Sequence, residues 1–410
     1  MNILFVHQNF PGQYLHLAPA LAAEPKNQVV ALSARDGVNL PGVGVVRYAI
    51  PNVPKAGIHP WLAEQQVKVL RGEAVARAAR QLRDQGFRPD VVCAHPGWGE
   101  ALFLKDVWPD CRLLLFCEFY YRARGSDMGF DPEFGGTQSD DDLCRLRMKN
   151  AHHLLSLEAM DRGVAPTRWQ QEQFPPEYRP RIEVVFDGID TAMVSPRPGA
   201  TVRLKRDNAA LSDADEVITF VARNLEPYRG FHIFMRALPQ ILRERPKARV
   251  IIVGGDDVSY GRRPEQGKTY RRMLLDEVGG GLDMSRVHFV GRVPHNIFLD
   301  VLRISSVHVY LTYPFVLSWS MLEAMSLGCL VVGSDTPPVR EVVRHGQNGL
   351  LVDFFDAHAL ARTVVQAAAD RSAHDHIRAN ARRTVVEKYD LATVCLPRHL
   401  ELVRTLAEGG

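Results

Sequence analysis

The chain has 410 residues, more than one compact core usually holds, so its length predicts two domains. Hydrophobic residues make up 46% and charged residues 24%, as in ordinary soluble globular proteins, and a net charge of +3 is too small to indicate a nucleic-acid partner. The six cysteines are scattered without paired spacing, which argues against disulfides and zinc. No apolar run approaches the length of a membrane span, and we expect a cytoplasmic protein.

Strand-like and helix-like runs alternate throughout the chain, which predicts an α/β fold. Residues 3–6 form the first expected strand, so the N-terminal run is interpreted as part of the fold and not as a targeting leader. The loop after this strand leads through Gly12 into a helix that opens at Gln13. A glycine at such a strand-to-helix turn lets the backbone approach a ligand phosphate.

A long helix is expected over residues 61–85. Its outer face carries a row of cations: Lys68, Arg71, Arg77, Arg80 and Arg83. Such a face is usually just solvated. A basic amphipathic helix can also rest on anionic lipid, so peripheral contact with the inner membrane face stays open as an alternative.

Two expected strands in the first half end in polar side chains. Strand 90–94 is followed by His95, and strand 112–117 is followed by Glu118 and Tyr120. Sites of α/β proteins form at the carboxyl ends of their strands, so these three side chains are candidates for a ligand site. For His95, a simple turn before a helix is the alternative interpretation.

The run Asp140-Asp141-Asp142 formally matches an Asp-x-Asp metal pattern. It opens a helix expected over 143–160, however, and does not end an apolar strand. Acids in the first turn of a helix are the normal cap and dipole pattern. The sequence therefore predicts no metal site.

The second half restarts with a strand at 217–222. Arg223 and Asn224 follow it, and Arg229 lies in the turn that leads to a helix expected over 231–244. Two arginines at the carboxyl end of a strand suit a diphosphate group. After the next strand, 249–253, Gly254 permits close approach by a nucleotide base.

The stretch 307–335 reads as a strand, a loop, a helix and a second strand. Ser318 and Ser320 lie near the start of the helix, where backbone amides and the helix dipole favour an anion. Glu323 is the only acid on this helix, and an acid beside a phosphate site is well placed to bind ribose hydroxyls. The alternative is that Glu323 is a helix former on a solvated face.

These motifs resemble the signature of the retaining GT-B glycosyltransferases of family 4, group 1. The resemblance rests on Leu322-Glu323-Ala324-Met325, Gly328, Glu341, Asn348-Gly349, the turn at 223–230 and Asp187-Gly188-Ile189-Asp190. Several positions depart from the family pattern, among them Val316-Leu317-Ser318 in place of a Gly-Phe-Gly loop and Arg229 in place of a lysine. Phe315 replaces the first glutamate of Glu-x7-Glu, Asn224 stands at the usual arginine with Arg223 beside it, and Glu118 replaces a histidine that faces the sugar.

The resemblance implies two Rossmann-like domains facing each other across a cleft. The acceptor domain is expected at 1–190 and the donor domain at 191–390, with a last helix, about 391–410, crossing back to the first domain. The implied co-substrate is a nucleotide-diphosphate sugar, UDP- or GDP-linked, with no cofactor and no metal. The acceptor is a glycan, a lipid-linked or a small-molecule hydroxyl, in polysaccharide or glycoconjugate biosynthesis.

The resemblance also implies roles for individual residues. Arg229 and Arg223 would neutralise the leaving diphosphate, and Glu323 would hold the ribose, which makes these three the catalytic candidates. His95, Glu118 and Tyr120 would lie on the acceptor or sugar side. The expected donor contacts are Gly12, Gln13, Asn224, Gly254, Arg292, Val293, Ser318, Trp319, Ser320, Met321 and Leu322.

Two other functions stay open. A GT-B sugar-nucleotide 2-epimerase or hydrolase shares the fold and would use His95 with Glu118 for carbon–oxygen chemistry. A non-catalytic nucleotide-sugar binder is suggested by Phe315 at a normally acidic position. The presence of both Arg229 and Glu323 argues against the binder.

Overall fold

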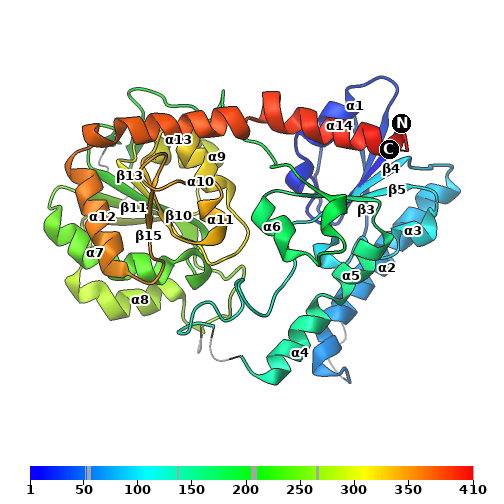
Figure 1. Cartoon of the computed structure of the whole chain (residues 1–410), viewed down its shortest axis with the longest axis horizontal. Helices are drawn as coiled ribbons and strands as arrows, with labels where there is room; N and C mark the ends of the chain where they lie inside the picture. The colour runs from blue at the N-terminus through cyan, green and yellow to red at the C-terminus, as the bar shows by residue number, and fades with distance from the viewer. Residues whose placement is uncertain (51, 53–56, 136–137, 205–209, 265–266, 410) are drawn as a thin grey trace. The chain divides into compact units, whose positions relative to one another are not determined.

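The computed structural model describes residues 1–50, 52, 57–135, 138–204, 210–264 and 267–409. They form two compact units, each with its own parallel sheet (Figure 1). Unit 1 comprises Met1–Arg124, Thr137–Gly188 and Ala392–Gly410, and unit 2 comprises Gly125–Gly136 and Ile189–Leu391. The predicted α/β class with two Rossmann-like domains is confirmed.

Unit 1 is built on a seven-stranded parallel sheet of order β3-β2-β1-β4-β5-β6-β7. Its central strands are buried on both faces, which is why they read as continuous apolar runs in the sequence. The order reverses between β1 and β4, so the carboxyl ends of these two strands border the crevice where α/β proteins bind ligands. The strands are β1 (Asn2–Val6), β2 (Gln28–Ser33), β3 (Val43–Arg47), β4 (Val91–Ala94), β5 (Arg112–Phe116), β6 (Arg162–Ala165) and β7 (Ile182–Val184).

The helix expected over 143–160 is in fact two helices that meet at Asn150. The Asn150 side chain accepts a hydrogen bond from the Tyr121 amide (3.2 Å) and donates one to the Tyr121 carbonyl (2.7 Å), and this pairing fixes the break. The helices of unit 1 are α1 (Leu17–Ala22), α2 (Ala63–Asp84), α3 (Leu104–Val107), α4 (Asp140–Lys149), α5 (Ala151–Ala159), α6 (Arg168–Gln173) and α14 (Leu396–Ala407).

The basic face expected on the long helix, α2, is smaller than the sequence predicts. Lys68 donates to the Gly97 carbonyl (2.8 Å) and Arg71 to the Gln8 side chain (2.7 Å), so both cations turn inward. Arg77 and Arg83 pair with acids of their own helix. None of the helices in the described ranges has the length and hydropathy that a bilayer crossing needs. Peripheral membrane contact stays a prediction.

The last helix, α14, belongs to unit 1, as predicted from the fold class (Figure 1, red). Leu402, Val403 and Leu406 lie in the same buried cluster as Ile3 and Phe5 of β1. His399 adds a hydrogen bond between its Nε2 and the Phe186 carbonyl (3.1 Å). The end of the chain is therefore part of the first core.

Unit 2 is built on a six-stranded parallel sheet of order β12-β11-β10-β13-β14-β15. The strands are β10 (Val217–Asn224), β11 (Arg249–Gly255), β12 (Val287–Gly291), β13 (Val307–Tyr310), β14 (Val331–Ser334) and β15 (Leu350–Val352). The helices are α7 (Phe231–Glu244), α8 (Tyr270–Val278), α9 (His295–Arg303), α10 (Trp319–Ser326), α11 (Pro337–Arg340), α12 (Ala357–Ala369) and α13 (Asp375–Lys388). Strands β8 (Thr201–Arg203) and β9 (Ala210–Ser212) form a small antiparallel pair that was not predicted.

One segment departs from the expected division at residue 190. Residues 125–136 precede that boundary, yet they are grouped with unit 2. Asp131 explains the difference, because its carboxylate is buried against His232 and Tyr313 of unit 2. The sequence gives no local signal for these pairings, since the partners are about a hundred residues or more away.

Candidate functional site

A cavity of about 640 Å³ opens at the carboxyl ends of β10, β11 and β12 in unit 2. These three strands are neighbours in the sheet, and this edge is where α/β proteins bind ligands. The structure brings one predicted catalytic residue, Arg223, together here with four predicted donor contacts: Asn224, Gly254, Arg292 and Val293. The other lining residues are Ala222, Val253, Ser259, His295 and Phe298.

Hydrogen bonds fix the polar wall of this cavity. Arg292 donates from Nη2 to the Asn224 side-chain oxygen (2.7 Å), and Asn224 donates in turn to the Ser259 hydroxyl (2.7 Å). Gly255 lies between them, and a Cβ there would come within 2.7 Å of both Arg292 Nε and Asn224 Oδ1. Arg223 stays exposed at the mouth of the cavity.

Glu323 of α10 reaches the cavity through His295. Its Oε1 lies 2.6 Å from His295 Nε2, and the His295 ring stacks on Phe298 with centroids 5.6 Å apart. The Glu323 side chain is 12% exposed, so it does not lie on a solvated face. The hydrogen bond with Glu323 raises the pKa of His295. Sequence reasoning missed His295 and Phe298, because α9 was not predicted.

The pair of His295 and Glu323 predicts a pH-dependent contribution to stability. A raised pKa in the folded state stabilises the fold at pH values below the ordinary His pKa, near 6.5, and this contribution is lost as the pH rises through the raised value. We expect His295→Ala to lower the free energy of unfolding by up to about 1 kcal/mol at pH 5.5 and by much less at pH 9. Urea unfolding at both pH values tests this, with exposed His376→Ala as the control. An equal loss at both pH values would contradict it.

Arg229 is buried beside the strand-to-helix loop at 311–318. Its Nη1 donates to the Thr312 hydroxyl (2.8 Å), to the Val316 carbonyl (3.0 Å) and more weakly to the Tyr310 hydroxyl (3.4 Å). Burial alone would lower the pKa of Arg229, but Tyr310, Tyr260 and Glu226 raise it, so the guanidinium stays charged. Arg229 is therefore a fixed positive charge, and only 8% of it is exposed.

Two further residues hold the turn around Arg229. Gly230 has φ +65°, and a Cβ there would lie 2.3 Å from Leu311 Cβ, so only glycine lets the turn pack on the chain after β13. Glu226 is fully buried, and its carboxylate accepts hydrogen bonds from the amides of Ser259, Tyr260 and Gly261 at 3.0–3.1 Å. Sequence reasoning missed Glu226, whose role depends on a loop 33 residues away.

Phe315 takes the place of the family's first glutamate, and it forms part of an aromatic cluster. The rings of Tyr260 and Phe315 lie over the Arg229 guanidinium, with Cζ 5.4 and 5.9 Å from their centroids. Tyr228 packs against Phe315 (5.4 Å). Aromatic faces thus meet the buried cation at a position where the family has a carboxylate.

The predicted anion site at the start of α10 is largely occupied by the protein's own hydrogen bonds. The Ser318 amide donates to the Tyr310 hydroxyl (2.9 Å), the Ser320 amide to the Ser318 hydroxyl (3.3 Å) and the Met321 amide to the Ser318 carbonyl (3.3 Å). The side chains of Met321 and Leu322 are fully buried, so only their backbone amides are left for the predicted donor contact, which stays a prediction. Trp319 is 42% exposed and remains accessible to a ligand.

In unit 1 the structure gathers four predicted residues around one carboxylate. Glu118 follows β5, and its Oε1 accepts a hydrogen bond from the Gln13 side chain (Nε2, 3.3 Å) while its Oε2 lies 3.3 Å from His95 Nε2. Gly12 precedes Gln13 with φ +48°, and a Cβ there would lie 2.7 Å from the His7 ring. The residues meet because β1, β4 and β5 are neighbouring strands.

Backbone amides fix the tautomers of both histidines in this cluster. His95 Nδ1 accepts from the Gly97 amide and His7 Nδ1 from the Asn9 amide, each at 3.0 Å, so Nε2 of each ring carries a proton. Burial, and to a smaller extent His95, lowers the pKa of His7 to about 3. Burial would raise the pKa of Glu118, but the hydrogen bond and charge of His95 lower it, so Glu118 is ionised.

Tyr120 does not join this carboxylate cluster. Its ring packs against His153 and Phe174, with centroids 6.1 and 5.7 Å apart, and it borders the buried core of unit 1. Residues two apart share a face of a strand, but β5 ends at Phe116, so strand alternation does not govern Glu118 and Tyr120. Among the described contacts, none links Tyr120 to His95 or Glu118.

The acids at 140–142 form the first turn of α4, and Asp142 caps this helix together with Ser139. The Ser139 hydroxyl accepts from the Asp142 amide (3.2 Å), and the Asp142 carboxylate accepts from the Ser139 amide (3.1 Å), which is a capping box. Among the described residues, no group of three His, Cys, Asp or Glu side chains is arranged to hold a metal ion.

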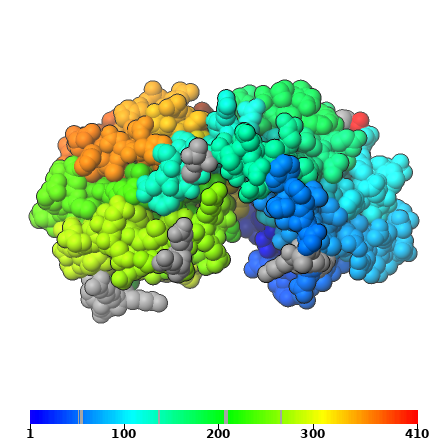
Figure 2. Space-filling model, turned by 90° about the horizontal axis from the view of Figure 1, so that it is seen from below, coloured from blue at the N-terminus to red at the C-terminus, as the bar shows by residue number. Residues whose placement is uncertain are grey.

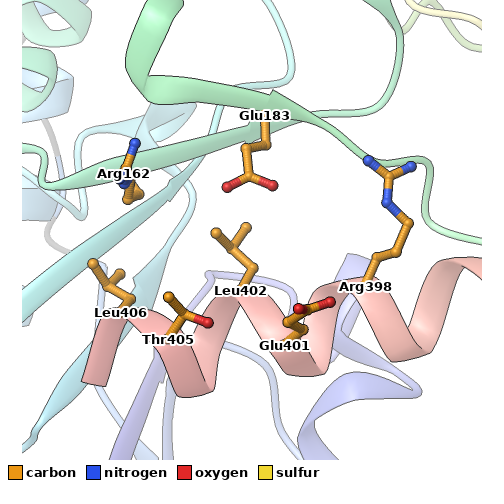
Figure 3. A pocket seen from close by; sticks show the side chains of 7 residues that line it. All are labelled: Arg162, Glu183, Arg398, Glu401, Leu402, Thr405 and Leu406. Carbon is orange, nitrogen blue, oxygen red and sulfur yellow. The ribbon is translucent and has the colours of Figure 1, made fainter. Parts of the chain in front are cut away.

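A second hollow, of about 300 Å³, lies between α14 and the edge of the unit 1 sheet (Figure 3). Arg162 of β6 and Glu183 of β7 face Arg398 and Glu401 of α14 across it. None of the predicted site residues lines this hollow. It is therefore separate from both clusters described above.

Comparison with known proteins identifies the family. The family described as "Glycosyl transferase family 4 group" matches residues 25–194, and "Glycosyl transferases group 1" matches residues 202–384. The two matches follow one another along the chain. The chain belongs to the GT-B glycosyltransferases of family 4, group 1.

Individual relatives agree with this membership, and solved structures agree with the fold. A D-inositol 3-phosphate glycosyltransferase from Rhodococcus jostii is 29% identical over 199 residues, which cover 47% of this chain and 41% of the relative. The match thus spans less than half of that relative's length. Sucrose-phosphate synthase from Thermosynechococcus elongatus has a TM-score of 0.73 at 19% identity, with both chains fully covered. Anabaena HepE in complex with UDP and glucose has a TM-score of 0.70 at 18% identity, covering 99% of this chain and 100% of HepE.

Proposed function

We propose that the protein is a retaining glycosyltransferase that moves a sugar from a nucleotide-diphosphate sugar to a hydroxyl acceptor. The observation that carries the proposal is the charged Arg229, held in a buried turn of the unit whose sheet edge forms the 640 Å³ cavity. Buried cations aimed at a developing negative charge are a major source of catalysis. Similarity to HepE, whose structure contains UDP and glucose, favours a UDP-linked donor over a GDP-linked one.

In this proposal the residues of unit 2 bind the donor. Arg292 and Val293 border the base, Glu323 holds the ribose hydroxyls, and Arg229 and Arg223 neutralise the diphosphate. The bond between the anomeric carbon and the phosphate oxygen breaks as the acceptor oxygen attacks on the same face. The acceptor proton passes to the leaving phosphate oxygen, so no separate base is needed.

The residues of unit 1 serve the sugar and acceptor in this proposal. Gly12 and Gln13 approach the diphosphate, and the ionised Glu118, supported by His95, accepts hydrogen bonds from hydroxyl groups. The acceptor is a glycan, a lipid-linked or a small-molecule hydroxyl, in polysaccharide or glycoconjugate biosynthesis in the cytoplasm. Because two arginines supply the positive charge, we expect the reaction to proceed without a metal ion.

A 2-epimerase is the second candidate. The observation in its favour is the pairing of His95 with Glu118, because an acid–base pair could serve carbon–oxygen chemistry. A non-catalytic binder is the third candidate, and the Phe315 substitution favours it. The three candidates differ in what happens to the donor.

Proton NMR of donor turnover separates these functions. UDP- and GDP-sugars are incubated with the protein and EDTA, with and without simple acceptors. We expect release of the nucleoside diphosphate and a product or free sugar whose first-formed anomer keeps the donor configuration. Epimerised nucleotide or sugar without glycosyl transfer would support the epimerase, and an unchanged donor would support the binder.

A further inference from the structure

Residues 125–135, called the strap here, are docked on unit 2 although they interrupt the sequence of unit 1. Figure 1 shows the strap as a teal coil without helix or strand. In Figure 2 its teal atoms lie against green and orange atoms of unit 2. Three of its polar side chains, Ser126, Asp127 and Asp131, are at most 4% exposed. Burying carboxylates costs desolvation free energy, so such a segment is held by specific partners.

The first anchor of the strap reaches the residue next to Arg229. The Tyr228 hydroxyl donates to Asp127 Oδ2 (2.9 Å), and the Ser126 hydroxyl donates to the other oxygen of Asp127 (3.0 Å). The Tyr228 carbonyl accepts the amide of Tyr313 (3.0 Å). The strap therefore fixes both the side chain of Tyr228 and the turn that carries Arg229.

The second anchor reaches the loop on the other side of Arg229. Asp131 Oδ2 accepts from the Tyr313 hydroxyl (2.5 Å) and lies 3.1 Å from His232 Nε2. Phe130 packs against Tyr313 with centroids 5.1 Å apart. Tyr313 begins the short stretch that leads to Phe315 and to the Val316 carbonyl, which accepts a hydrogen bond from Arg229.

The strap thus contacts both segments that surround the Arg229 guanidinium, because Asp127 binds Tyr228 in the turn before Arg229 and Asp131 binds Tyr313 in the loop after β13. Tyr228 packs on Phe315 (5.4 Å) and Tyr313 (4.6 Å), and the Phe315 ring lies over the guanidinium. A movement of the Tyr228 ring would shift this aromatic wall and so change the direction of the Arg229 side chain. The strap itself has no hydrogen bond to Arg229 among the described contacts.

We propose that the strap positions Arg229 for the donor diphosphate, with Asp127 acting through Tyr228 and Asp131 through Tyr313. The inference rests on the proposed function, in which Arg229 binds the diphosphate. Asp127, Tyr228 and Asp131 are positioning residues in this scheme. They determine how well the phosphate farther from the nucleoside is bound, and they leave the base and ribose contacts unchanged.

The test compares a nucleoside diphosphate with the matching monophosphate. Calorimetry measures the binding of UDP and UMP to wild type, Asp127→Asn and Tyr228→Phe. The pairs GDP and GMP, and ADP and AMP, are titrated in the same way. We expect each variant to bind the diphosphate about threefold to tenfold more weakly, as for the loss of one hydrogen bond, and the monophosphate as wild type does. Glu133→Gln is the matched control, because Glu133 anchors the outer end of the strap to Arg236, away from Tyr228.

Each outcome of the titrations decides one proposal. If wild type binds none of these nucleotides, the proposed function fails. If wild type prefers a diphosphate and both variants keep the full preference, the strap does not position Arg229, while the proposed function stands. If diphosphate and monophosphate affinities fall together, the strap only stabilises the fold, and the positioning role is also overturned. Circular dichroism confirms that both nearly isosteric variants are folded.

Discussion

Replacing Arg229 with alanine is expected to cost about 2–4 kcal/mol of transition-state stabilisation, measured as kcat/KM for the nucleotide-sugar donor. The reason is the placement of the guanidinium, which is charged, 8% exposed and held by Thr312 and Val316. A buried cation cannot be replaced by water or by the exposed Arg223 without loss of geometry. Arg229→Lys should keep part of the activity, because it keeps the charge but only part of the hydrogen bonding.

The control for Arg229→Ala is Arg243→Ala near the end of α7, the helix that follows the Arg229 turn. The Arg243 side chain is 70% exposed, and its only described ion pair is a 3.8 Å contact with Glu244. We expect this variant to have the wild-type kcat/KM. Wild-type turnover by Arg229→Ala would remove this arginine from the catalytic account.

Asp131→Ala is expected to lower the free energy of unfolding by about 3–5 kcal/mol at pH 7, because it leaves the buried His232 and Tyr313 side chains without their shared acceptor. Asp131 and His232 are each 1% exposed, and Asp131 also accepts hydrogen bonds from Tyr313 and from the Glu133 amide (2.8 Å). Urea unfolding followed by circular dichroism measures the change. Asp84→Ala, which breaks an exposed pair with Arg83, should change stability by less than about 1 kcal/mol.

The loss of unfolding free energy in Asp131→Ala should also depend on pH. Burial would raise the pKa of Asp131, but the hydrogen bonds from His232 and Tyr313 lower it to about 2. A carboxylate with a lowered pKa stabilises the fold above its ordinary pKa, near 3.9, and this contribution is lost as the pH falls towards 2. The stability gap between wild type and Asp131→Ala should therefore narrow below pH 4. A gap that widens on acidification would contradict this explanation by a buried, hydrogen-bonded carboxylate.

Local sequence signals were sufficient for the main elements of the fold. The helix predicted at 231–244 is α7, Phe231–Glu244, because the apolar positions repeat with helical period after a glycine-bounded turn. The buried parallel strands were found because both of their faces are apolar. The prediction that several site residues gather at one sheet edge was possible because each of them follows the end of a strand. These residues are Arg223, Asn224, Gly254 and Arg292.

What the sequence could not provide depends on partners far apart in the chain. Lys68 turns inward because the Gly97 carbonyl is within reach, and the helix break at Asn150 depends on Tyr121. The family resemblance named Met321 and Leu322 as donor contacts, and it did not show that helical rotation directs both side chains into the core. The docking of Asp131 on unit 2 needs partners 101 and 182 residues later in the chain.

Nucleotide-induced thermal stabilisation is the most direct test of the donor site. The panel contains nucleotides and nucleotide-diphosphate sugars, used with wild type and Arg229→Ala, each with and without EDTA. A ligand at a hundred times its dissociation constant should add about 2.7 kcal/mol of stability. We predict that one diphosphate stabilises wild type, does so equally with EDTA, and fails to stabilise Arg229→Ala. No shift with any nucleotide would contradict the donor site, and a shift that requires a metal ion would contradict the metal-independent reaction.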